Sequence, residues 1–119
     1  EFRRVLFRSI QECLKRQEKT AQRMEAFLQD ILRIGMPVLL IAPPALNRGA
    51  WVQDEIRIDE SRILSGLYKE LTIKLGADFA DAGEWAVELS FDGVHFTEAG
   101  HKAFAQGLKK HLEEKLYER

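Results

Sequence analysis

The chain has 119 residues, 45% of them hydrophobic and 31% charged, and a formal net charge of −1. This length permits one small domain, and the composition is that of an ordinary globular protein. Because acidic and basic residues are interleaved without a basic face, we expect no nucleic-acid partner.

The first nine residues, Glu-Phe-Arg-Arg-Val-Leu-Phe-Arg-Ser, lack an initiating methionine and resemble a translated sequencing adapter. We therefore interpret residues 1–9 as a non-native leader, and we place the domain in residues 10–119. The alternative is a genuine basic first turn of the helix that follows. Genomic sequence ahead of Ile10 distinguishes the two, and it would also show whether a signal peptide preceded the domain.

Apolar residues recur at helical spacing over residues 10–34, which predicts one long amphipathic helix. Gly35 and Pro37 end it, since Gly accepts a left-handed conformation and Pro cannot continue a helix. We expect the helix to cover a sheet, the alternative being a partner surface. The only cysteine, Cys13, falls on the apolar spacing, which favours a buried thiol in a reducing, cytoplasmic setting.

The next segment, Val38-Leu39-Leu40-Ile41-Ala42, is short and continuously apolar, which predicts a strand buried on both faces as in parallel sheets. It is too short to span a membrane. A strand so apolar makes a poor sheet edge, so we expect a second neighbouring strand for it. Since this chain offers no candidate for that neighbour, the predicted fold is incomplete.

A connection over residues 45–58 contains Trp51 and leads to a second helix, predicted over residues 59–75 with Gly76 as its left-handed C-terminal residue. Residues 77–81 predict a second short strand. The alternation of helices and strands is typical of a parallel α/β sheet built with right-handed crossovers.

A loop over residues 82–96 contains Trp85 and leads to a last helix that has Thr97 as its expected N-cap. The stretch Asp92-Gly93-Val94-His95-Phe96-Thr97-Glu98-Ala99-Gly100-His101 opens this helix at the carboxyl edge of the sheet, where functional loops gather. On such a turn, the Asp92 carboxylate can contact one nitrogen of His95. The other nitrogen then stays free to take a proton from a hydroxyl nucleophile.

The block from Asp92 to Gly100 resembles the last conserved block of the SGNH (GDSL) hydrolases, and residues 39–44 resemble their fourth strand and its proline-rich turn. The likeness covers residues 10–117, roughly the last half of such a domain. Within the family, the chain most resembles small aryl- and acetyl-esterases. It implies the C-terminal half of a flavodoxin-like three-layer α/β/α domain. It also implies a serine esterase for small acyl or aryl ester substrates, without cofactor or metal.

Carried over from this resemblance, His95 is the general base and Asp92 its orienting partner. The family's Gly-Asp-Ser block, oxyanion-hole Gly and Gly-x-Asn-Asp block have no counterpart in this sequence. Ser61 and Ser65 fall on a predicted helix, and Ser90 lacks the strand-to-turn context of a nucleophile. We therefore expect this chain alone to be inactive, because it lacks nucleophile and oxyanion donors.

Trp51 and Trp85 lie on the two long loops, where they either line an acyl or aryl pocket or anchor their loops in the core. Asp81, at the end of the second strand, is expected to have a structural role in a turn.

His101 is expected to pack or face solvent, and His111 to lie on the solvated face of the last helix. A metal site built from His101 with Asp92 and His95 matches no familiar ligand spacing. In the structural alternative, His95 is a packed or capping residue and Asp92 a turn former.

A second hypothesis treats the chain as a non-catalytic α/β half-domain that associates with itself through the open strand at residues 38–42. It depends on the doubly apolar strand and on the absence of a nucleophile.

Overall fold

The computed structural model describes the backbone of residues 2–117 and the side chains of residue 12 and residues 14–117. The predicted burial of Cys13 lies outside these described side chains. Three α-helices alternate with two strands, and a 3₁₀ helix follows the second strand. In chain order the elements are α1 (Phe2–Arg33), β1 (Leu39–Ala42), α2 (Glu55–Leu75), β2 (Asp78–Asp81), η1 (Ala82–Glu84) and α3 (Glu98–Tyr117).

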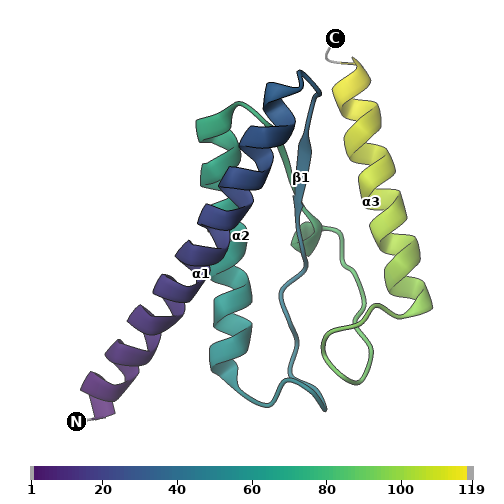
Figure 1. Ribbon diagram of the computed structural model, residues 1–119. Coiled ribbons are helices and arrows are strands. Elements are labelled where there is room, and N and C mark those ends of the chain that lie inside the picture. Colours follow the sequence, from purple (N-terminus) through teal and green to yellow (C-terminus); the bar gives the residue numbers. More distant parts are fainter. Residues whose placement is uncertain (1, 118–119) are drawn as a thin grey trace.

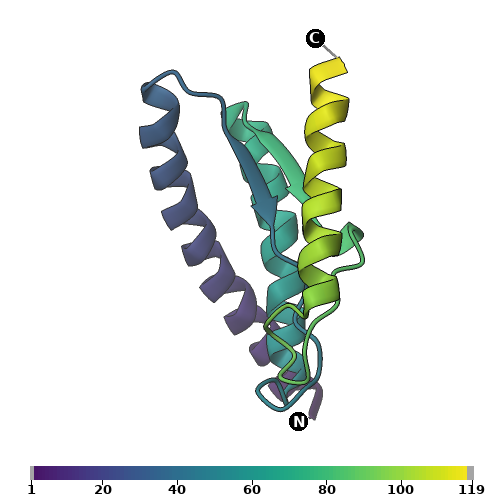
Figure 2. The same cartoon turned by 90° about the vertical axis from the view of Figure 1, so that its right-hand side faces the viewer.

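The two strands form a parallel pair in which Leu39 lies opposite Asp78 and Ala42 opposite Asp81. Helices α1 and α2 pack side by side on one side of the strands, and α3 lies on the other side (Figures 1 and 2). The predicted α/β class, with parallel strands between flanking helices, is therefore confirmed.

The hydrophobic core lies between the sheet and the α1–α2 layer. Its buried members come from three elements: Leu28 from α1, Leu40 and Ala42 from β1, and Tyr68 and Leu71 from α2. The long first helix therefore covers the sheet layer, as predicted. Burial of these side chains is the main force that holds the layers together, since each large apolar side chain contributes about 1.5–3 kcal/mol.

Helix α3 is attached by a separate set of contacts. The indole of Trp85 packs against the ring of Phe104 at 5.2 Å between ring centroids. A Cβ at Gly107 would lie 2.3 Å from the Trp85 ring, so a glycine is needed for this approach. Near the C-terminal end of the helix, His111 Nε2 lies 3.0 Å from Asp78 Oδ2 at the start of β2.

The predicted helix ends agree with the structure better than the predicted starts. Gly35 and Gly76 have φ of 86° and 75°, the left-handed conformation expected of residues that follow a helix. Helix α2 begins at Glu55 rather than at 59, because in its first turn, Glu55-Ile56-Arg57-Ile58, polar and apolar residues alternate and do not show helical spacing. Helix α1 begins at Phe2 and includes residues 2–9. A helical backbone is compatible both with an adapter-derived leader and with a genuine first turn of the helix. The adapter origin of these residues therefore stays a prediction.

The second strand of the sheet pairs with β1 on one edge. Within residues 2–117, no strand pairs with the other edge of β1. On β1, Leu39 and Ile41 are only partly buried, whereas Leu40 and Ala42 are buried.

Candidate functional site

The candidate site lies beyond the carboxyl ends of β1 and β2, where the connections that follow the two strands come together (Figure 1). The second of these connections forms a narrow loop, because Leu89 and Phe96 form an antiparallel bridge and the Ser90 N–H donates to the His95 carbonyl at 2.7 Å. At its end the Thr97 hydroxyl accepts a hydrogen bond from the Gly100 N–H at 3.0 Å, so the predicted N-cap of α3 is confirmed.

The carboxylate of Asp92 is buried in this loop, with 8% of its side chain exposed. One oxygen, Oδ1, accepts from the backbone N–H of Val94 at 2.8 Å and of His95 at 2.9 Å, and from the hydroxyl of Ser90 at 2.8 Å. The Val94 N–H contributes most to holding the pKa of Asp92 well below its usual range, and together with the other donors it outweighs the opposing effect of desolvation. Asp92 is therefore ionised at neutral pH.

The imidazole of His95 lies against the other carboxylate oxygen, with 2.7 Å between Nδ1 and Asp92 Oδ2. Since an ionised carboxylate can only accept hydrogen bonds, Nδ1 carries the proton and the neutral ring has its lone pair on Nε2. The side chain is 64% exposed, and no group among the described side chains is hydrogen bonded to Nε2. Nδ1 is thus fixed by Asp92 while Nε2 stays free to accept a proton, which is the geometry that a general base requires.

The two tryptophans differ in what they contact. Trp51 is 62% exposed, and its ring meets the His95 imidazole edge-to-face, with 5.2 Å between centroids and 83° between planes. Trp85 packs instead on Phe104 of α3. The structure thus brings Trp51 to the candidate site, while the contacts of Trp85 favour the alternative of a core anchor over a place in the pocket.

Two of the three serines considered as nucleophiles are hydrogen bonded elsewhere. The Ser61 hydroxyl accepts from the Leu46 N–H at 3.0 Å and donates to the Ile58 carbonyl at 2.6 Å, and Ser90 donates to Asp92. Ser65 is partly buried on α2. Among the serines whose side chains the structure describes, none has its hydroxyl hydrogen bonded to the His95 ring.

Two of the polar residues singled out from the sequence have structural contacts of the expected kind. Asp81 Oδ1 accepts from the Gly83 N–H at 2.8 Å and caps η1, so the structural turn role predicted for it is confirmed. His101 is exposed, and its ring lies 5.2 Å from that of Phe96. In the part of the chain that the structure describes, no three His, Cys, Asp or Glu side chains are grouped as metal ligands.

The prediction for His111 is wrong. Its side chain is only 18% exposed, and it faces the sheet, where it pairs with Asp78. Helical periodicity missed this contact because the partner lies 33 residues away and is itself a polar residue within a strand.

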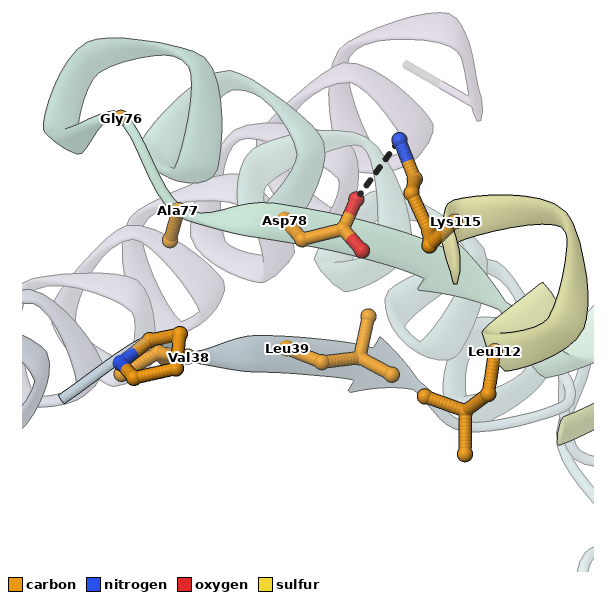
Figure 3. A pocket seen from close by; sticks show the side chains of 8 residues that line it. Val38, Leu39, Gly76, Ala77, Asp78, Leu112 and Lys115 are labelled. Atoms are coloured by element: carbon orange, nitrogen blue, oxygen red, sulfur yellow. Dashed lines mark ion pairs between the residues drawn. The ribbon is translucent and has the colours of Figure 1, made fainter. Parts of the chain in front are cut away.

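Two pockets lie at opposite ends of the strands. One of about 460 Å³ adjoins the candidate site, and its lining includes Pro44, Ser61, Leu89, Val94 and Phe96. The other, of about 610 Å³, lies at the amino ends of the strands, where Figure 3 shows the Asp78–Lys115 ion pair on its wall. Of these two pockets, only the first is lined by the residues on either side of His95 in the sequence, Val94 and Phe96.

Comparison with solved structures identifies esterases. A candidate arylesterase from Agrobacterium tumefaciens matches with TM-score 0.57 and 30% identity, over 66% of this chain and 38% of that chain. The aryl esterase of M. smegmatis matches over the same shares, with TM-score 0.58 and 26% identity. A carbohydrate acetylesterase family member from Sinorhizobium meliloti matches with TM-score 0.58 and 27% identity, over 66% of this chain and 38% of its own.

A further solved structure matches with TM-score 0.69 and 20% identity, over 84% of this chain and 51% of that chain, and supports the fold alone. This chain therefore spans between about 38% and about half of the length of these structures. No family model and no curated protein matches the chain. Within residues 2–117, no helix is both long and apolar enough to cross a membrane.

Proposed function

We propose that this chain, which has the fold of the C-terminal part of an SGNH esterase domain, supplies the general base His95 and its partner Asp92 to a serine esterase. The observation that carries the proposal is the 2.7 Å contact between Asp92 Oδ2 and His95 Nδ1, with Nε2 on the exposed side of the ring. The esterases among the structural neighbours support ester hydrolysis as the reaction, with small acyl or aryl esters as substrates.

In the proposed reaction, a serine hydroxyl attacks the ester carbonyl while His95 Nε2 takes the hydroxyl proton. The carboxylate of Asp92 stabilises the resulting imidazolium through its hydrogen bond with Nδ1–H. The imidazolium then gives the proton from Nε2 to the departing alcohol, leaving an acyl-enzyme. Water, deprotonated by the same nitrogen, then attacks the acyl-enzyme. As the acyl–serine bond breaks, Nε2 gives this proton to the serine oxygen, and the acid is released. The reaction as proposed uses no cofactor or metal.

The nucleophile in this proposal is supplied by residues outside the 119, since the sequence has no Gly-Asp-Ser block. The same holds for the oxyanion donors, which supply a large part of the rate enhancement in acyl transfer. The chain alone is accordingly proposed to be inactive. A cytoplasmic setting belongs to the proposal because the single cysteine cannot form an internal disulfide.

The test uses the product of the intact gene, including the residues encoded ahead of Ile10. We expect it to hydrolyse p-nitrophenyl acetate and to lose about 10²- to 10⁴-fold of that activity on His95→Ala, the share that general base catalysis contributes. His101→Ala is the matched control, since this exposed histidine on α3 has no hydrogen bond to Asp92. Equal rates for parent and His95→Ala would exclude the proposal, as would labelling of the 119-residue chain at a serine by a fluorophosphonate probe.

The alternative function is self-association through β1. It is favoured by the edge of β1 that has no strand beside it within residues 2–117, and by the partial exposure of Leu39 and Ile41. Sedimentation equilibrium of the chain distinguishes the two proposals: a dimer that is lost when Ile41 is replaced by Lys supports association, and a monomer at all concentrations excludes it.

A further inference from the structure

A tight turn after β1 lies directly on the Asp92 loop. Gly49 and Val52 form a two-way bridge, with the Gly49 N–H donating to the Val52 carbonyl at 3.0 Å and the Val52 N–H to the Gly49 carbonyl at 3.1 Å. This bridge places Ala50 and Trp51 at the tip of the turn. Their backbone N–H groups are therefore not used within the turn and point outward.

Those outward N–H groups bind the backbone of the Asp92 loop. Ala50 donates to the Phe91 carbonyl at 2.9 Å and Trp51 to the Asp92 carbonyl at 3.1 Å. A third bond, from the Asn47 N–H to the Gly93 carbonyl, measures 3.0 Å. Three consecutive carbonyls of the loop thus accept hydrogen bonds from one segment, which we name the docking turn and define as Asn47–Val52.

Two glycines make this close approach sterically possible. A Cβ at Gly49 would lie 2.6 Å from the Phe91 carbonyl oxygen and 2.7 Å from the Asp92 carbonyl carbon. On the opposite side, Gly93 has a φ of 81°, and a Cβ there would lie 2.1 Å from the Asn47 carbonyl oxygen. Because these neighbours are backbone atoms, a side chain at either position would separate the two loops.

The docking turn also holds the imidazole. Since the His95 side chain is 64% exposed, few contacts restrain its ring apart from the Nδ1 bond to Asp92 and the edge-to-face contact with Trp51. A single hydrogen bond leaves the ring able to swing about its side-chain torsions. The backbone of Trp51 is held by its N–H bond to the Asp92 carbonyl, and from there its indole lies edge-to-face against the His95 ring, on one side of that motion.

We propose that Trp51 is a positioning residue, held by the docking turn, that keeps the His95 imidazole in the orientation in which Nδ1 faces Asp92 and Nε2 faces the substrate. This inference rests on the proposed function for its chemical meaning. Its structural content, a restraint on one ring by another, is measurable without any ester hydrolysis.

The first test is NMR of the imidazole in the 119-residue chain carrying Trp51→Leu, a change at an exposed position. We expect the His95 Nδ1–H to exchange with water about three- to tenfold faster than in the parent, the change that loss of one aromatic pair implies. The Val94 amide and the His111 ring are internal controls and keep their exchange rates. An unchanged His95 ring, or equal acceleration at His111, would overturn the inference.

The second test addresses the docking turn with a matched pair of glycine variants. Gly49→Ala should reproduce the faster exchange at His95, because the added methyl group displaces the docking turn from the Asp92 loop. Gly66→Ala, at an exposed site of α2 where an added Cβ meets nothing within 4 Å, should leave the His95 ring unchanged. If Gly49→Ala folds with parental exchange at His95, the docking turn has no positioning role.

A third measurement separates positioning from substrate contact in the gene product that includes the upstream residues. Trp51→Leu should lower kcat about tenfold and leave KM for p-nitrophenyl acetate unchanged, because misplacement of a base acts on the chemical step. A raised KM with parental kcat would make Trp51 a pocket wall instead. If the parent has no esterase activity while the NMR results hold, the proposed function fails and the restraint by Trp51 stands.

Discussion

The chain contains two Asp–His pairs that use the same residue types in opposite ways. In Asp92–His95 the carboxylate is 8% exposed and the imidazole 64% exposed, whereas in Asp78–His111 the figures are 32% and 18%. In the first pair the aspartate is therefore buried and the histidine exposed, whereas in the second pair the histidine packs against the sheet. In the first pair a mostly exposed imidazole lies beside an ionised carboxylate, which suits proton exchange with another molecule, whereas the imidazole of the second pair is largely buried.

The difference follows from how each carboxylate is surrounded. Asp92 lies in a loop whose own backbone N–H groups converge on it. Asp78 begins a strand. Burial raises its pKa, but hydrogen bonds from His111, from the Phe79 N–H and from Lys115 outweigh this effect and leave the pKa lowered. The Asp78 pair thus links β2 to α3, the helix that contributes no side chain to the main core.

The largest expected effect is on folding stability when each carboxylate is removed. Asp92→Ala leaves two backbone N–H groups and a hydroxyl in a closed loop without their acceptor, whereas Asp78 is more exposed and its partner Lys115 can turn to water. We expect Asp78→Ala to lower the free energy of unfolding by about 1 kcal/mol and Asp92→Ala to lower it by about twice as much or more. Urea unfolding of both variants measures this, and equal losses would mean that the Asp92 network stabilises the fold no more than the Asp78 pair does.

The next effect is the pH dependence of stability. Both aspartates have a lowered pKa in the folded chain, so each contributes stability that is present above the unfolded pKa of about 3.9 and is lost as the pH falls through the folded value. Melting temperatures should therefore decrease steeply below about pH 4. The decrease should be shallower in Asp92→Asn, whose amide does not titrate, and a variant that melts with the parental slope would assign the acid sensitivity to other carboxyl groups.

The sequence predicted one of these pairs and not the other, for a physical reason. Asp92 and His95 are three residues apart, so a short turn brings them together without help from the rest of the fold. The same locality made the left-handed Gly35 and Gly76 predictable. His111 meets Asp78 only because α3 crosses the sheet, and Trp51 meets His95 only because two loops from different strands dock through their backbones. Because backbone hydrogen bonds form between groups that nearly every residue has, such contacts cannot be predicted from residue types.

The smallest expected effect is the contrast between the two histidines. His95→Ala removes an exposed ring and should change the free energy of unfolding by less than about 0.5 kcal/mol, as at other exposed sites. His111→Ala removes a largely buried ring and its hydrogen bond to Asp78, and should lower stability by about 1 kcal/mol, chiefly by loosening α3. Hydrogen exchange resolved along α3 would locate that loosening. The two substitutions should thus separate the roles: the histidine that matters least for folding is the one on which the proposed chemistry depends. If His95→Ala proved the more destabilising, His95 would instead be a packed or capping residue, the structural alternative to a base.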